Sequence, residues 1–387
     1  MAQQQAQQAQ QSPAALNIAA RNLITASAIK KTQEIYNETF DPASKTTLNI
    51  NPRNAGLILG FFVEVNASVT NGATDAAAAT EFGPSNMLSN ISFFDLSNNV
   101  RINTAGWHMG MLNTAKNRAP AFGAQTLTSY PIDYGRNFTD LISAPDLAAD
   151  ATGTVNMLYW VPLAYSALDL RGAVYANVVN ATMNLQLTFN NGGFFVATGS
   201  DPASAVYIGN ANGTVTSVQC RVHQVYYDQL PVSQKTNQPV LPVLDLSTVY
   251  EIKNTTLTGL SANSDFPIPY ANFRDFLSTC VVYNNGGSLN DGTDIDYFAM
   301  QTANFTNTFK VPPKIVKAWE RQAIRDDFPS GSYYLETRDR PISTIQFGNM
   351  ELILNASTVN SGAEVRVGWE SFAILNNIGD ASSLSAG

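Results

Sequence analysis

Residues 183 to 193 read Met183-Asn184-Leu185-Gln186-Leu187-Thr188-Phe189-Asn190-Asn191-Gly192-Gly193, and this stretch decides the fold. Its first seven residues alternate apolar and polar side chains, which is the pattern of a half-buried antiparallel strand. The Asn-Gly-Gly that follows is typical of a tight turn, because Asn and Gly adopt positive φ at low cost. The stretch therefore predicts one strand of a sheet that ends in a sharp turn.

The same alternation recurs along most of the chain. It is clearest over residues 155–161, 350–354 and 365–369. Turn chemistry returns between such runs at Asn71-Gly72, Asn212-Gly213, Asn285-Gly286-Gly287 and Asp291-Gly292. Many short strands joined by turns of this kind predict an all-β sandwich or barrel.

A Pro-rich segment over residues 230–242 separates two strand-rich parts. We expect it to be a linker between two all-β domains, of which the first is larger because of long loops. A chain of 387 residues buries enough surface to need no disulfides. The two thiols, Cys220 and Cys280, each fall inside an alternating apolar run, which predicts two small buried side chains.

The content of charged and apolar residues excludes several classes of function. Only 13% of the residues are charged, and such an uncharged polar surface suits a protein that packs against copies of itself. The net charge of -8 argues against a nucleic-acid partner, because that affinity depends on Lys and Arg. The sequence has neither an apolar run of membrane-spanning length nor a signal-peptide pattern, so we expect synthesis in the cytoplasm.

The N-terminus begins with a Gln/Ala tract over residues 1–12 that has no means of forming a core. Ser12-Pro13 is a typical helix start, and helical spacing of apolar residues predicts one helix from Pro13 to about Tyr36. Such a helix would rest on its own protein or on an anionic membrane surface. The candidate contact residues are Leu16, Leu23, Lys30 and Lys31.

A second helix is predicted to run from Pro312-Pro313 to about Asp326. Helical spacing places four basic residues on one face and four uncharged residues on another. The basic residues are Lys314, Lys317, Arg321 and Arg325, and the other set is Ile315, Trp319, Gln322 and Ala323. The basic face would contact lipid headgroups or a neighbouring subunit, or would be solvated and partly neutralised by nearby acids.

Residues that carry chemistry are scarce. His108 and His223 stand alone, and His223 is predicted to lie on the solvent side of a strand. No catalytic or phosphate-binding motif is present, so no cofactor and no enzyme activity are expected. The carboxylates leave one other class of protein open, a carbohydrate-binding or glycoside-cleaving β-sandwich, because glycoside cleavage needs only two positioned acids. Asp291, Asp294 and Asp296 suit either ordinary turns or a calcium loop.

Several longer motifs follow one another in order. They are Thr39-Phe40-Asp41-Pro42-Ala43, Phe82-Gly83-Pro84, Gly106-Trp107-His108, Asn113-Thr114-Ala115-Lys116, Tyr159-Trp160-Val161-Pro162-Leu163-Ala164-Tyr165-Ser166, Asp228-Gln229-Leu230-Pro231, Asp245-Leu246-Ser247-Thr248, Tyr270-Ala271-Asn272, Asn285-Gly286-Gly287-Ser288, Gly292-Thr293-Asp294-Ile295, Thr302-Ala303-Asn304-Phe305, Asp327-Phe328-Pro329 and Gly348-Asn349. The chain resembles the major capsid protein of tectiviruses, the icosahedral phages with an internal membrane, over essentially its whole length. The Gln/Ala tract and the last ten residues do not match.

The resemblance implies a double jelly roll, with two eight-stranded barrels and an N-terminal helix beneath them. The expected segments are an arm and helix (1–38), a first jelly roll (39–240), a second (241–377) and a tail (378–387). The resemblance also implies that the chain is a structural protein of the virion shell. Its pseudo-hexagonal homotrimers would tile an icosahedral lattice. Implied partners are other trimers, vertex and minor capsid proteins, and the internal membrane, with no catalytic residue. Trp107 and Trp160, in the best-matched motifs, are expected structural anchors.

Overall fold

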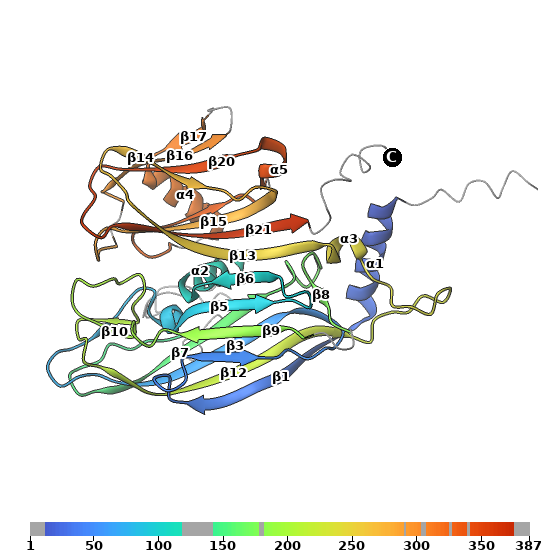
Figure 1. The fold of residues 1–387 in the computed structure, drawn as a ribbon, viewed down its shortest axis with the longest axis horizontal. Helices are drawn as coiled ribbons and strands as arrows, with labels where there is room; N and C mark the ends of the chain where they lie inside the picture. Colours follow the sequence, from blue (N-terminus) through green and yellow to red (C-terminus); the bar gives the residue numbers. More distant parts are fainter. Residues whose placement is uncertain are drawn as a thin grey trace, which may run out of the picture.

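The structure is a computed structural model that describes residues 12–117, 142–177, 182–289, 292–302, 307–324, 327–338 and 341–374. It contains two β-barrels that lie next to each other, and helix α1 lies at one end of the pair (Figure 1). The prediction of a double jelly roll is confirmed.

The first barrel consists of two facing four-stranded sheets. One sheet has the order β1 (Ile29–Phe40), β12 (Thr214–Asp228), β3 (Leu57–Thr70) and β7 (Thr152–Pro162), with β8 (Val174–Tyr175) beside β3. The other has the order β2 (Thr47–Ile50), β9 (Asn184–Phe189), β5 (Leu88–Phe94) and β6 (Val100–Thr104). A small sheet of β10 (Phe195–Val196), β11 (Tyr207–Ile208) and β4 (Ala78–Ala79) closes one end.

The second barrel repeats this arrangement in the same chain order. Its first sheet runs β13 (Thr248–Thr258), β21 (Glu364–Ile374), β15 (Arg274–Asn284) and β18 (Ser332–Glu336), with β19 (Ile342–Ser343) beside β15. Its second sheet runs β14 (Ser264–Pro269), β20 (Met350–Ala356), β16 (Ile295–Thr302) and β17 (Asn307–Val311). Each barrel therefore has the strand order of an eight-stranded jelly roll.

The helices connect strands or occupy the barrel ends. They are α1 (Pro13–Ser27), η1 (Gly83–Met87), α2 (Gly106–Asn117), α3 (Val243–Leu246), α4 (Pro313–Ile324) and α5 (Thr344–Phe347). Among the described residues, no helix is long and apolar enough to cross a lipid bilayer.

A continuous sheet joins the two barrels. Strand β6 of the first barrel pairs in parallel with β13 of the second, with Ile102 opposite Ile252. The core of the first barrel extends across this junction to second-barrel residues such as Tyr250 and Phe372, whereas the rest of the second barrel has a separate core. The two barrels thus bury apolar surface together as one body.

The alternation seen in the sequence matches the burial of side chains. In β9, Leu185, Leu187 and Phe189 are buried while the residues between them are partly exposed. Both thiols are buried and unpaired, in agreement with the prediction. Burial raises the pKa of Cys220 to about 12, so this thiol stays protonated and unreactive at neutral pH.

The prediction of one helix to about Tyr36 is wrong, because α1 ends at Ser27. Ser12 caps its start as expected, and its side chain accepts a hydrogen bond from the amide of Ala15. From Ile29 onward the chain is the edge strand β1, which pairs antiparallel with β12. Lys30 and Lys31 therefore lie on β1. The pairing of eleven residues with β12 outweighs the local helix preference of a segment rich in Lys, Gln and Glu.

Candidate interaction surfaces

Helix α1 is fixed to the protein by a polar cluster and one apolar side chain. Asn17 donates a 2.8 Å hydrogen bond to the buried carboxylate of Asp245 and accepts one from the amide of Leu244. Arg21 grips the same carboxylate with two hydrogen bonds of 2.6 Å. Ile24 is fully buried against the outer side of the first barrel. The helix thus docks on its own protein through one face.

Three large apolar side chains of α1 are exposed on either side of its docked face. Leu16, Ile18 and Leu23 have 54%, 52% and 44% of their surface accessible. Val243 and Leu244 of the adjacent α3 are exposed as well, and α1 and α3 lie side by side in Figure 1. We call these five residues the floor patch. Several exposed apolar side chains on neighbouring elements are typical of a contact with lipid or protein.

The other two predicted contact residues lie on β1. Lys30 is exposed. Lys31 is also exposed and forms a 2.5 Å ion pair with Asp228, which raises the pKa of the lysine.

A cluster of buried charges connects the barrels. Lys116, at the end of α2, reaches 2.7 Å from Glu370 on β21, which has no exposed surface. Glu370 also accepts hydrogen bonds from Tyr250 (2.5 Å) and Ser278 (2.7 Å), and it lies 3.3 Å from Arg338. Four side chains thus surround the carboxylate with donors and positive charge, so the buried charge is compensated.

The electrostatics of this cluster favour the charged carboxylate. Burial alone would raise the pKa of Glu370, but Lys116 and Arg338 outweigh it and hold this pKa at about 2. Burial lowers the pKa of Lys116, while Glu370 acts in the opposite direction. The geometry is that of a structural ion pair. Since each partner comes from a different barrel, it holds the two jelly rolls together.

The start of α2 makes the second contact across the junction. His108 is fully buried, its Nδ1 lies 2.7 Å from the hydroxyl of Thr104, and its ring packs on the backbone of Gly368. A Cβ at Gly368 would come within 2.3 Å of that ring. Burial lowers the pKa of His108 to about 3, so the ring is neutral. The neighbouring Trp107, an expected anchor, is buried.

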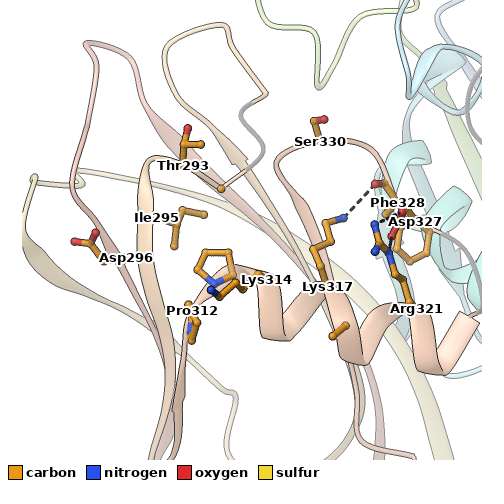
Figure 2. Close-up of a pocket in the computed structure, with 13 residues that line it drawn as sticks. Thr293, Ile295, Asp296, Pro312, Lys314, Lys317, Arg321, Asp327, Phe328 and Ser330 are labelled. Carbon is orange, nitrogen blue, oxygen red and sulfur yellow. Dashed lines mark hydrogen bonds and ion pairs between the residues drawn. The ribbon is translucent and has the colours of Figure 1, made fainter.

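A cleft of about 860 Å³ opens beside α4 (Figure 2). Lys314, Lys317 and Arg321 line one side, and Asp296 lies on the other. Arg321 pairs with Asp327 at 2.5 Å. Arg325, the fourth predicted basic residue, lies outside the described residues. The structure thus brings three of the four predicted basic residues to one cleft.

The basic residues of this cleft are partly neutralised. Lys317 donates to Glu320 (2.8 Å) and to the carbonyl of Phe328 (3.1 Å). Glu320 is itself buried and accepts from the amides of Phe328 and Tyr334. The sequence did not predict that Glu320 is buried, because an acidic residue on an amphipathic helix normally indicates a solvated position.

The face of α4 toward its own barrel consists of Val316, Glu320 and Ile324. Ile315 and Trp319, predicted to share another face, are 37% and 39% exposed. Trp319 packs edge-on against Phe309 of β17, with 5.5 Å between ring centroids. An apolar surface therefore remains open along α4 and β17.

A second aromatic surface lies on the first barrel. Trp160 of β7, the other expected anchor, is only partly buried, and its ring packs at a tilt against Phe62 of β3, with 4.7 Å between the ring centroids. Phe62 is 38% exposed. His223 lies beside it on β12, partly exposed as predicted for the solvent side of a strand.

The candidate calcium loop is only partly described. Asp291 lies outside the described residues, Asp294 accepts a hydrogen bond from Asn285, and Asp296 is exposed at the cleft. No group of three His, Cys, Asp or Glu side chains close enough to hold a metal ion occurs in the described part of the chain.

Comparison with known proteins gives consistent matches. A family model for the N-terminal part of the P3 major capsid protein matches residues 1–230, and one for its C-terminal part matches residues 247–386. Major capsid protein P3 of Enterobacteria phage PRD1 is 43% identical to this chain, and the match covers 99% of this chain and 97% of that protein.

Solved structures share the fold at low identity. The major capsid protein of Sulfolobus Turreted Icosahedral Virus superposes with a TM-score of 0.63 at 12% identity, over 93% of this chain and all of that chain. A chain of the PBCV-1 virus capsid gives a TM-score of 0.54 at 9% identity, over 89% and 94% of the two chains.

Proposed function

The chain belongs to the P3 major capsid protein family, and from this we propose that three copies form a ring of six jelly rolls that tiles a shell over a membrane. As a member of this family it is a structural protein of the virion shell, not an enzyme. The capsid lattice of such proteins requires association with further copies.

The observation that carries the trimer is the repetition of one barrel within the chain. Both barrels have the same strand order, and one continuous sheet joins them side by side. Three such chains around a threefold axis supply six similar barrels, so a trimer fills a sixfold position in a lattice. The shared core across the junction keeps the two barrels of one chain rigid.

The solution mass tests the trimer. The purified protein is expected to have a mass of about 125 kDa by light scattering, three times the 41.8 kDa of one chain. A mass that stays at 41.8 kDa in dilute and concentrated samples would contradict the trimer.

The floor patch supports a membrane on one side of the shell. Leu16 and Leu23 project from α1 away from the protein, and Lys30 is exposed at the start of β1. Apolar side chains next to a basic residue suit an anionic lipid surface. Neighbouring trimers and the vertex and minor capsid proteins are further proposed partners.

Flotation with vesicles tests the membrane contact. Wild-type protein is expected to float with vesicles that contain one third anionic lipid, and a Leu16→Glu/Leu23→Glu variant to stay at the bottom. A matched control is Phe347→Glu, which changes an exposed apolar residue on α5 of the second barrel. Equal flotation of all three proteins, or flotation of none, would contradict the contact.

A further inference from the structure

The tetrapeptide Asn-Asn-Gly-Gly occurs twice in the chain, at residues 190–193 and 284–287. The first follows β9 of the first barrel, and the second begins at the last residue of β15 in the second barrel. In each tetrapeptide an asparagine, Asn191 or Asn285, precedes a glycine. An asparagine loses its side-chain ammonia most readily before glycine, because no Cβ hinders the approach of the glycine nitrogen. The two asparagines therefore have the same local sequence, and only the surrounding structure can make their reactivity differ.

Asn285 is held in place by the second barrel. Its side chain is buried, with 1% of its surface accessible. Its Nδ2 donates to the carboxylate of Asp294 (2.8 Å) and to the carbonyl of Thr358 (3.3 Å). Its Oδ1 accepts a 2.7 Å hydrogen bond from the amide of Asn360. These contacts retain the leaving nitrogen and fix the plane of the carboxamide, so Cγ is not free to turn toward the nitrogen of Gly286.

Asn191 has none of these restraints. Asn191 and Gly192 are both exposed. Within the described part of the chain, neither the side chain of Asn191 nor the amide of Gly192 has a hydrogen-bond partner. A Cβ placed on Gly192 would meet no atom within 4 Å. The carboxamide can therefore rotate, and the turn can adjust at little cost in free energy.

Two further Asn-Gly dipeptides begin at Asn71 and Asn212. Asn71 is buried, and the amide of Gly72 points at its Oδ1 at 2.9 Å. Its Nδ2 donates to three carbonyl oxygens, those of Asp75, Leu147 and Ala148. Asn212 is exposed, but its backbone amide donates to Oδ1 of Asn210 at 3.0 Å, which braces the turn. Among the four dipeptides, the one at Asn191 is thus the least restrained.

We propose that Asn191 is a site of spontaneous deamidation, with water as the only other reactant. The nitrogen of Gly192 loses its proton and attacks Cγ of Asn191, so that a new C–N bond forms. The Cγ–Nδ2 bond breaks, and ammonia leaves with the proton. Water then opens the resulting succinimide ring. Its attack at Cγ gives aspartate, and its attack at the main-chain carbonyl carbon gives isoaspartate.

The reaction changes the charge at one end of the first barrel. The turn leads from β9 to β10, at the end of the barrel away from α1 (Figure 1). Deamidation adds a negative charge to a chain whose net charge is already -8, and isoaspartate also lengthens the backbone by a methylene group. In the shell over a membrane, this end faces outward, so the outer surface becomes more negative with age. This last step rests on the proposed function, whereas the reaction itself does not.

Peptide mapping of purified protein stored in mildly alkaline buffer tests the site. Brief digestion with a protease that cleaves after aromatic residues separates Asn191 from Asn212, because Phe195 and Tyr207 lie between them. Mass spectrometry then reports the replacement of NH2 by OH at each asparagine. In the folded protein, Asn191 is expected to convert at least tenfold faster than Asn285. In urea that unfolds the chain, the two are expected to convert at equal rates, because their tetrapeptides are identical.

The matched variant is Gly192→Ala. The added methyl group has space in the fold, but it hinders the attacking nitrogen. Conversion at Asn191 is expected to slow at least fivefold, while conversion at Asn212 stays unchanged. A rate at Asn191 that Gly192→Ala leaves unaltered would overturn the route through Gly192.

The comparison of the two tetrapeptides decides the proposal. Equal conversion of Asn191 and Asn285 in the folded protein would overturn it. So would an Asn191 that stays intact in the folded protein while both asparagines convert in urea. Each readout is independent of the solution mass, so failure of the proposed trimer and failure of this site are distinguishable.

Discussion

The amine of Lys116 lies 2.7 Å from the carboxylate of Glu370, and this ion pair connects the two jelly rolls of the chain. Lys116 stands on α2 of the first barrel, and Glu370 stands on β21 of the second. In the proposed trimer, the angle between the barrels determines how well six of them fit a ring, so we expect residues at this junction to affect both stability and assembly.

Removing the amine is expected to destabilise the protein. Lys116→Met leaves the buried Glu370 without its nearest cation, and breaking a buried pair costs about 3–5 kcal/mol. We expect a lower midpoint in denaturant unfolding. The double variant Lys116→Met/Glu370→Gln should recover part of the loss, because a neutral amide is cheaper to bury than an unpaired carboxylate. Equal midpoints for wild type and Lys116→Met would rule out a stabilising role.

Acid is expected to weaken the junction in two pH windows. The folded pKa of Glu370, about 2, lies below its ordinary value of 4.5, so the unfolded chain binds more protons between these values. Stability from this group is complete above about pH 4.5 and is lost as the pH falls toward 2, on the order of 3 kcal/mol in total. Unfolding midpoints measured from pH 6 to 2 check this, with Glu370→Gln as the variant that lacks the dependence.

The other acid window belongs to His108. Its folded pKa of about 3 lies below the ordinary 6.5, so protonation of the unfolded chain lowers stability as the pH falls from about 6.5 toward 3. His108→Asn retains a hydrogen-bonding atom near Thr104 but does not titrate. Its stability should therefore change less between pH 6.5 and 4.5 than that of wild type. Parallel curves for both proteins would contradict a buried neutral histidine.

The contact of His108 with Gly368 leaves no space for a methyl group. Gly368→Ala places a Cβ against the ring, and overpacking of this kind costs about 1–3 kcal/mol. The matched control is Gly192→Ala, where no atom lies within 4 Å of the added Cβ. Thermal unfolding should separate the two variants. A Gly368→Ala protein as stable as the Gly192→Ala protein would show that the barrels can move apart without cost.

Much of the fold was predictable, because the alternation of apolar and polar residues in a strand shows which side chains are buried. Strands such as Asn184–Phe189 alternate clearly, and the turns after them carry Asn and Gly. The end of α1 was not predictable. The segment after Ser27 contains good helix formers, and only pairing with β12, almost two hundred residues away, makes it a strand.

The interaction surfaces were less predictable than the barrels. The sequence placed Lys314, Lys317 and Arg321 on one helix face, and the structure places them in one cleft. It gave no sign that Glu370 is buried, because its partners come from four segments that are far apart in the sequence. The similar placement of α2 after β6 and of α4 after β17 was also hidden, since the two helices do not share sequence.

Helix α1 is expected to detach when its polar cluster is broken. Asn17→Ala leaves the buried Asp245 and the amide of Leu244 each short of one partner, at about 1–3 kcal/mol. Hydrogen exchange over residues 13–27 should become faster while the barrel strands keep their protection. Asn22→Ala, at an exposed position of the same helix, is the control. Unchanged exchange in Asn17→Ala would mean that Arg21 and Ile24 hold the helix without Asn17.

The two tryptophans expected as anchors should behave differently. Trp107 is buried beside the junction, so Trp107→Ala is expected to lower the free energy of unfolding by about 3–5 kcal/mol. Trp160 is partly exposed on the outer face, so Trp160→Ala removes less buried surface and costs less in the single chain. Its larger effect should be on association, because Trp160 and the exposed Phe62 form an aromatic surface on the outer face of the first barrel.

Unfolding and mass measurements on the same two variants distinguish these roles. Denaturant unfolding at low protein concentration reports the cost to the chain, and light scattering over a dilution series reports the cost to the trimer. We expect Trp107→Ala to dominate the first measurement and Trp160→Ala to weaken the trimer while remaining folded. If Trp160→Ala unfolds as readily as Trp107→Ala, then Trp160 supports the barrel rather than the contact between copies.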